Sequence, residues 1–344
     1  MSRPAGAALA ALLSIAAAAP LSPPATAGLT AAPDIAAAYD AILDADFAAF
    51  PSRLAVACDR APREACRMLD ALAVWWQIAL EPESRGRDVT FERLADEAIE
   101  AALAWTTREP DRAEAWFYLG AAYGTRVQFR VLCEQRLSAA RDGKRIKESL
   151  ERALALDPAM HDAAYGLGLY RYYADIGPGA LKILRWLLLL PAGDRDGGLR
   201  QIVDARDRGL LVRAEADYQL HLIYLWYEHR ATDALAIVRR LQEAHPRNPL
   251  FWQIDAEIAD VYFHDHAASL ATASDLLSRA TDGRVNEASL ASVRARLQMA
   301  TELDHLGRYS RAIETLQSIV AEHPTRPYGA TARAQSLMKI IARK

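Results

Sequence analysis

Apolar residues recur every three to four positions along most of the chain, and short polar turns interrupt them. In one such stretch Met68, Leu72, Trp75 and Trp76 stand at helical spacing, and a new stretch begins at Phe91. This period predicts amphipathic helices that each bury one face. The helices are expected at residues 34–44, 47–58, 64–80, 91–105, 213–227, 231–244, 250–263, 267–280, 287–306 and 310–323, with a last helix at 328–342.

A longer pattern repeats along these helices. Six residues after Pro110, the sequence Trp-x-x-Leu-Gly-x-x-Tyr begins at Trp116, and Pro246 and Trp252 stand at the same spacing. After Pro158, an alanine, a leucine and a glycine occupy the corresponding places. The pattern resembles a tetratricopeptide repeat. This resemblance implies an all-α, right-handed α-solenoid of about six antiparallel helix pairs, with the last helix as a cap over its end.

One part of the chain departs from the repeat. Residues 172–175 and 184–198 are similar to exported bacterial repeat proteins of unassigned function, and more distantly to the inclusion-body-clearance repeat family of the mitochondrial outer membrane. Residues 177–198 contain an apolar run, 181–190, which as a helix is about 15 Å long, half the hydrocarbon core of a bilayer. The run is therefore too short to span a membrane. Burial between helices is expected, and a position in a membrane interface is the alternative.

The first 27 residues have the features of a secretory signal. Arg3 precedes an apolar run of alanine and leucine, and the small-x-small site Ala25-Thr26-Ala27 follows it. The alternatives are a disordered leader or a retained membrane anchor. No cysteine near the site offers a lipid attachment point. We expect a periplasmic or secreted protein whose mature part, residues 28–344, is one repeat domain.

Export changes the interpretation of the cysteines. Cys58 and Cys66 flank a predicted turn between two helices, in a compartment where disulfides persist. We expect them to form a disulfide, and two free buried thiols are the alternative. Cys133 is left over and is expected to be a small core residue.

The repeat that begins at Trp116 is longer than a repeat of about 34 residues by about 14 residues. The insert, about 124–145, is rich in basic residues and includes Arg126 and Arg130. These two arginines are candidate contacts to a partner. The alternative is a solvated face on two lengthened helices.

Charge and motifs exclude several functions. The formal net charge is −3, and removal of residues 1–27 would make it −4 because Arg3 is their only charged side chain. Such a chain has no global attraction for nucleic acid. The sequence has no phosphate-binding Gly-x-x-x-x-Gly-Lys loop, no Gly-x-Ser-x-Gly and no His-Glu-x-x-His. His264 and His266 are the nearest approach to a metal cluster, but residues two apart on a helix point to different sides, so no metal site is expected. Because no cofactor motif or catalytic motif is found either, we expect no cofactor and no enzymatic activity.

Three tyrosines are the candidate binding residues. Tyr165, Tyr172 and Tyr173 fall on a first helix of the repeat, whose exposed face is expected to line the concave groove. Interhelical packing is the alternative for each. We therefore expect an exported scaffold that binds a protein or peptide through its concave surface. The alternative is a structural or assembly component held peripherally at an envelope membrane by residues 180–190 and the basic insert.

Overall fold

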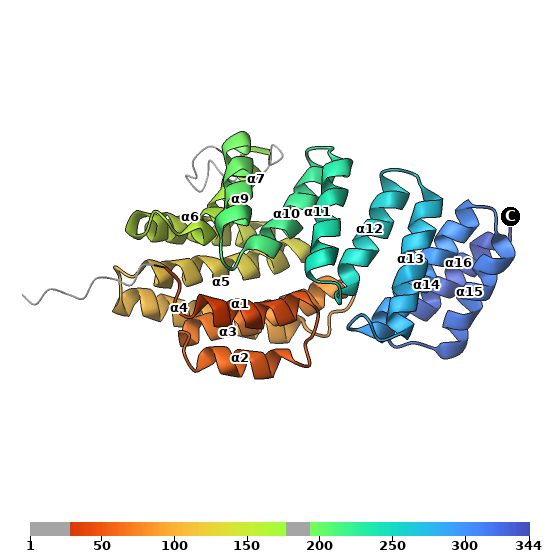
Figure 1. Ribbon diagram of the computed structural model, residues 1–344, viewed down its shortest axis with the longest axis horizontal. Helices are drawn as coiled ribbons and strands as arrows, with labels where there is room; N and C mark the ends of the chain where they lie inside the picture. The colour runs from red at the N-terminus through yellow and green to blue at the C-terminus, as the bar shows by residue number, and fades with distance from the viewer. Residues whose placement is uncertain (1–27, 177–192) are drawn as a thin grey trace, which may run out of the picture.

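The computed structural model describes residues 28–176 and 193–344, and in these two ranges the chain forms fifteen helices and no strand (Figure 1). The all-α expectation is therefore confirmed. The predicted signal, 1–27, and the apolar run at 181–190 lie outside the described residues. The helices, labelled as in Figure 1, are α1 (Ala32–Leu43), α2 (Phe50–Cys58), α3 (Arg63–Leu80), α4 (Asp88–Arg108), α5 (Ala113–Leu132), α6 (Arg136–Leu156), α7 (His161–Ile176), α9 (Arg195–Arg208), α10 (Arg213–Trp226), α11 (Ala231–Ala244), α12 (Pro249–Val261), α13 (His266–Thr281), α14 (Ala288–His305), α15 (Tyr309–Glu322) and α16 (Ala330–Ile341).

Helices that follow one another in the sequence pack as pairs. The described residues form the pairs α1–α2, α3–α4, α5–α6, α7–α9, α10–α11, α12–α13 and α14–α15, and α16 packs on the last of them. The first helices of neighbouring pairs also touch, as in α1 with α3, α3 with α5 and α5 with α7. From α10 to α16 the helices follow one another along the long axis of the molecule, and α1 to α6 are stacked on one another at its other end (Figure 1). The described part therefore holds seven pairs, where about six were expected. None of its helices has both the length and the apolar composition required to cross a bilayer.

The first helices of the chain also pack against helices far away in the sequence. Trp76 of α3 is buried, with its ring centroid 5.0 Å from that of Tyr218 in α10 and 6.2 Å from that of Phe251 in α12. The buried amide of Asn248, just before α12, donates a hydrogen bond of 2.7 Å to the carbonyl of Leu43, at the end of α1. Through these contacts the middle of the helix array, α10 and α12, packs against its start, α1 and α3.

Charged residues also join the end of α3 to the C-terminal helices. Glu81, at the end of α3, is buried and accepts hydrogen bonds from the Arg326 side chain (2.7 Å) and the backbone N–H of Tyr328 (2.9 Å). Nearby, Glu83 pairs with Arg294 of α14 at 2.8 Å. The loop before α16 is thereby fixed to the end of α3.

Close helix packing depends on glycines. Leu150 of α6 is buried between two of them, because a Cβ at Gly120 of α5 or at Gly166 of α7 would each come within 2.5 Å of a Leu150 methyl carbon. A second contact joins α7 and α9 through their backbones. A Cβ at Gly168 would lie 2.9 Å from the carbonyl oxygen of Gly198, and one at Gly198 would lie 2.7 Å from the carbonyl oxygen of Gly168.

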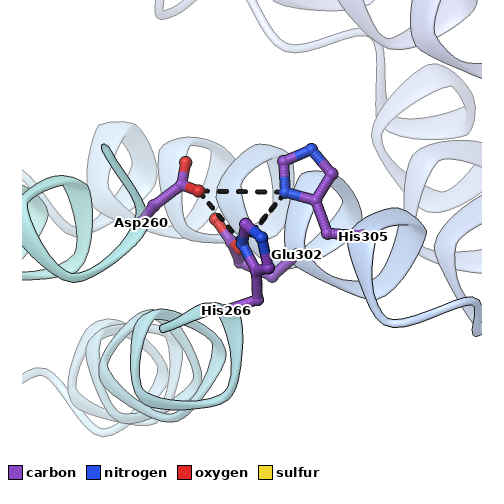
Figure 2. Close-up of side chains that lie close together, drawn as sticks. All are labelled: Asp260, His266, Glu302 and His305. Carbon is purple, nitrogen blue, oxygen red and sulfur yellow. Dashed lines mark hydrogen bonds and ion pairs between the residues drawn. The ribbon is translucent and has the colours of Figure 1, made fainter. Parts of the chain in front are cut away.

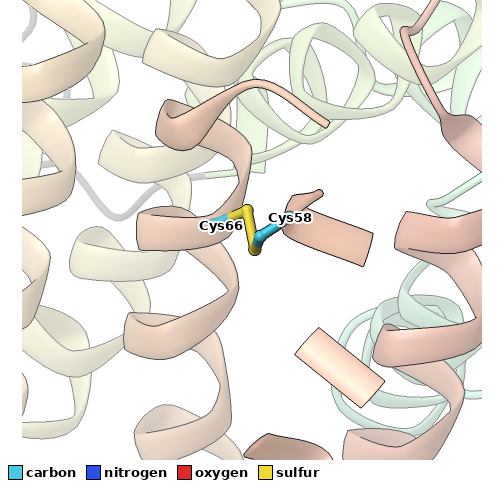
Figure 3. Close-up of a disulfide and its surroundings, with 2 residues drawn as sticks. All are labelled: Cys58 and Cys66. Atoms are coloured by element: carbon cyan, nitrogen blue, oxygen red, sulfur yellow. A yellow bond between two sulfur atoms is a disulfide. The ribbon is translucent and has the colours of Figure 1, made fainter. Parts of the chain in front are cut away.

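The disulfide expected from the sequence is present in the structure. Cys58, the last residue of α2, is bonded to Cys66 in the first turn of α3 (Figure 3). The bond spans the short turn between the two helices. Cys133 follows α5, has no disulfide partner, and is half-buried rather than in the core.

The α7–α9 contact generates a stability prediction. The substitution Gly198→Ala inserts a methyl group between two backbones that cannot move apart locally, and overpacking of this kind costs about 1–3 kcal/mol. We expect a lower free energy of unfolding, measured by urea denaturation.

Gly143→Ala is the matched control. Gly143 is also inside a helix, α6, but an added Cβ there meets no atom within 4 Å. Alanine is the better helix former by about 1 kcal/mol, so this variant should be as stable as wild type or more stable. Equal stability of both variants would contradict a tight α7–α9 contact.

Candidate functional site

A groove with a volume of about 1530 Å³ lies among the first helices of the pairs. Its walls come mainly from α3, α5, α6, α7, α10 and α12, and α1 contributes two further side chains. Most of the lining is apolar or aromatic, for example Leu72, Trp75, Tyr165, Tyr173 and Ile254. We call this cavity the apolar groove. It is larger than the roughly 300–1,000 Å³ of pockets for small molecules.

Exposed apolar side chains gather at this groove. Fifteen large apolar side chains are exposed in the described part of the chain, and about half of them line it. Exposed hydrophobic surface of this extent is typical of a binding site. Trp226 ends α10 and is 57% exposed, and Val261 ends α12 and is 58% exposed. The groove members of the exposed set are Val131, Leu132, Leu137, Trp226, Tyr227, Val261 and Tyr262.

These rim residues were missed by the reasoning from sequence, although a signal existed. The pairs Trp226–Tyr227 and Val261–Tyr262 each stand at the end of a first helix and are 35 positions apart, about one repeat. An apolar pair that recurs at the ends of first helices and stays exposed there indicates a shared surface. Recurrence at the repeat period was therefore the observation that could have identified them.

Four polar side chains of the apolar groove form one hydrogen-bond network. Glu215 of α10 is buried and accepts hydrogen bonds from the Tyr39 hydroxyl of α1 (2.7 Å) and the Gln128 amide of α5 (3.3 Å). Gln219 in turn donates to the Gln128 side-chain oxygen at 3.0 Å. Burial raises the pKa of Glu215, and the hydrogen bonds from Tyr39 and Gln128 oppose that increase. This network ties α1, α5 and α10 together beneath the groove.

Asp162 is the second buried acid in the groove wall. Its carboxylate accepts hydrogen bonds from the backbone N–H groups of Leu210, Leu211 and Val212, at 2.7–3.1 Å. These three residues lead into α10, so Asp162 of α7 fixes the start of that helix. Its acceptors are engaged by the chain itself.

Two of the three tyrosines expected in the groove line it. Tyr165 and Tyr173 are half-buried in its wall, about two turns apart on α7. The Tyr173 ring packs edge-on against Tyr227, with centroids 5.8 Å apart. These two side chains therefore belong to the same aromatic surface as the rim.

The prediction for Tyr172 is wrong. Its side chain is 0% exposed, and its hydroxyl donates a hydrogen bond of 2.5 Å to Glu228, which Arg195 of α9 also holds by two hydrogen bonds. Burial and the neighbouring Glu228 carboxylate raise the pKa of Tyr172. The cause is α9, whose Gly198 lies against the backbone of Tyr172 and so covers this side of α7. Tyr172 is a core residue.

Arg126 and Arg130 are not a free basic surface. Asp142 of α6 is buried, and it pairs with Arg126 at 2.8 Å and with Arg130 at 2.6 Å. Arg126 also pairs with Asp96 of α4 at 2.5 Å. The two arginines therefore neutralise a buried carboxylate, and the insert lengthens α5 and α6 instead of forming a separate patch. That they contact a partner stays a prediction.

A second cluster joins polar side chains from three helices. Figure 2 shows Asp260 of α12, His266 of α13, and Glu302 and His305 of α14 converging on one point. Glu302 is fully buried, and its pKa is raised by burial and by the Asp260 carboxylate. The sequence His264-Asp265-His266 points to His266, but the other three members are close only in the folded chain. His264 takes no part and lies in the turn with a φ of 53°.

No family model matches the chain, and no curated protein matches it. The candidate sites are therefore defined by their geometry alone.

The burial of Tyr172 has a measurable consequence. Truncation of a large buried aromatic side chain costs roughly 3–5 kcal/mol. Tyr172→Ala should lower the free energy of unfolding by that amount in urea denaturation, whereas Tyr173→Ala, at a half-buried site, should cost clearly less. Unfolding of the Tyr172→Ala chain at the wild-type urea concentration would show that this side chain is not part of the core.

His221 of α10 provides a pH-dependent prediction. This histidine is buried in the groove wall, and burial lowers its pKa from 6.5 to about 4. As the pH falls, the unfolded chain takes up the proton first, so the native state loses stability between pH 6.5 and pH 4. This group alone should remove about 2 kcal/mol of stability between pH 7 and pH 5.

The measurement compares urea unfolding at pH 7 and pH 5. His221→Gln, which cannot titrate, should be less sensitive to pH than wild type by that amount. His323→Gln replaces an exposed histidine and should leave the pH dependence unchanged. An identical pH dependence in wild type and His221→Gln would show that His221 is not held neutral by burial.

Proposed function

We propose that the chain is an exported helical-repeat binding protein of the tetratricopeptide type, a right-handed α-solenoid whose apolar groove holds a segment of a partner polypeptide. The repeat pattern of the sequence supports this proposal, as do the successive helix pairs and the contacts between first helices. The disulfide at Cys58 and Cys66 supports export, since such bonds persist outside the cytoplasm.

The observation that carries the proposal is the exposed apolar lining of the groove. Trp226 and Val261 are each more than half exposed, although both stand next to a large buried core. Leaving such side chains in water is unfavourable by roughly 25 cal/mol per Å² of apolar surface, and a bound apolar ligand relieves that cost. Exposed tryptophan and tyrosine side chains at a groove also match the residues that dominate binding energy at interfaces.

The groove favours an amphipathic helix as the bound segment. A helix of about 13 residues is about 20 Å long and 10–12 Å wide, with a volume similar to that of the groove. Glu215 and Asp162 have their acceptors satisfied within the chain, so a ligand gains little from charge at the base of the groove. Apolar side chains at positions i, i+3, i+4 and i+7 of the partner are then the main anchors.

The hydrogen bonds of the buried acids favour binding over catalysis. The two buried acids in the groove wall are engaged in fixing helices, Glu215 with Tyr39 and Asp162 with the start of α10. A catalytic group has to be directed at a substrate. We therefore propose a binding role.

A peptide selection tests the proposal. The full chain, immobilised, should enrich a displayed random library for peptides with apolar residues at helical spacing. Trp226→Ala should weaken a selected peptide by about 2 kcal/mol, roughly 30-fold in Kd, because a rigid anchor is lost from the groove rim. The Kd values can be measured by fluorescence anisotropy.

Tyr328→Ala is the matched control, because Tyr328 is 72% exposed and lies outside the groove. This variant should bind the peptide like wild type. Equal weakening by both variants would place the peptide elsewhere. Sedimentation of the chain with anionic vesicles, without enrichment of any peptide, would instead favour a peripheral membrane role.

A further inference from the structure

In the cluster of Asp260, His266, Glu302 and His305, hydrogen-bond acceptors outnumber the protons that could be donated to them. His266 Nδ1 lies 2.9 Å from Glu302 Oε2, 3.0 Å from His305 Nδ1 and 3.1 Å from Asp260 Oδ1. A ring nitrogen carries at most one proton, so it can satisfy only one of these three neighbours. His305 Nδ1 is 3.8 Å from both carboxylates, too far for a hydrogen bond.

We propose that these four side chains bind a divalent transition-metal ion, with Zn²⁺ as the best match. One cation at their centre would contact all four lone pairs at once. Ligands at about 2.0–2.1 Å from zinc lie about 3.3 Å apart in a tetrahedron. Five of the six separations among these atoms run from 2.9 to 3.8 Å, which brackets that value, and all four ligand atoms lie within 4.8 Å of one another.

The chemistry of the donors selects the metal class. Two imidazoles suit zinc and its neighbours, while Mg²⁺ and Ca²⁺ prefer sites made of oxygen alone. Two carboxylates and two neutral imidazoles balance the charge of a divalent cation. His305 is partly exposed, which provides an entry route, while Glu302 is fully buried and anchors the site from within.

A surrounding residue orients the carboxylates. The Gln298 side-chain amide donates a hydrogen bond of 2.5 Å to Glu302 Oε1, the oxygen that does not face His266. The same amide lies 3.4 Å from Asp260 Oδ2. Both carboxylates are thereby held at their outer oxygens, which leaves Glu302 Oε2 and Asp260 Oδ1 directed at the centre of the cluster. Such supporting hydrogen bonds are a regular feature of metal sites.

The metal has a structural role in this arrangement. Four protein ligands complete a tetrahedron and leave no open position for water or substrate, which distinguishes structural from catalytic zinc. The ligands come from α12, α13 and α14, so the ion joins two successive helix pairs. Asp260 directly precedes Val261, so the ion also fixes the end of α12 at the groove rim. The metal site does not depend on what the groove binds.

The test uses the full chain, produced without a polyhistidine tag and stripped of metal with a chelator that is then removed. Zn²⁺ is titrated in competition with a chromogenic chelator, and Co²⁺ reports the coordination geometry by its visible absorption. We expect one tightly bound ion per chain and the intense absorption of tetrahedral Co²⁺. Zinc at 100-fold its Kd should raise the melting temperature by about 3–6 °C.

His305→Ala and His266→Ala should each weaken Zn²⁺ binding at least tenfold and abolish the Co²⁺ spectrum. His305 is partly exposed and stands in the last turn of its helix, so its variant is expected to remain folded, which circular dichroism checks. His264→Ala is the matched control from the same turn and should bind like wild type. No tight binding by wild type, or equal binding by His264→Ala and His305→Ala, would overturn the proposal.

Discussion

The packing of α3 around Trp76 is the contact on which the rest of the structure depends. A stack of helix pairs in which each contacts only its neighbours has no reason to bring its start close to its middle. Here Trp76 is buried against α10 and α12, and the Asn248 amide binds the carbonyl at the end of α1. As a result, α1 and α3 line the apolar groove together with α5, α7, α10 and α12.

The packing of α1 and α3 against α10 and α12 also determines where polar groups are buried. Tyr39, Gln128 and Gln219 converge with Glu215 beneath the groove, so a carboxylate that would be costly alone is compensated within the wall. The cost of burying a carboxylate is compensated in a similar way at Asp142, which two arginines neutralise. With Glu215 engaged in this way, the groove presents mainly apolar surface to a ligand.

Local periodicity predicted the helices well, because each buries one face at a regular spacing. The predicted bounds at 64–80 and 231–244 differ from those of α3 and α11 by at most one residue. The environment of a helix face was harder to predict. Tyr165 and Tyr172 are seven residues apart and lie on nearly the same side of α7, yet one lines the groove and the other is core, where Gly198 of α9 lies against its backbone. Asp260 and Glu302 are 42 positions apart, so their meeting depends on how α12 and α14 pack.

Photo-crosslinking in cells that express the full chain tests the groove as the binding surface most directly. A photoreactive phenylalanine analogue would replace one of four exposed valines: Val131 and Val261 in the groove, or Val56 and Val89 outside it. The groove hypothesis predicts discrete, protease-sensitive adducts at Val131 and Val261 and none at Val56 or Val89. Adducts of equal strength at all four positions, or only at Val56 and Val89, would contradict it.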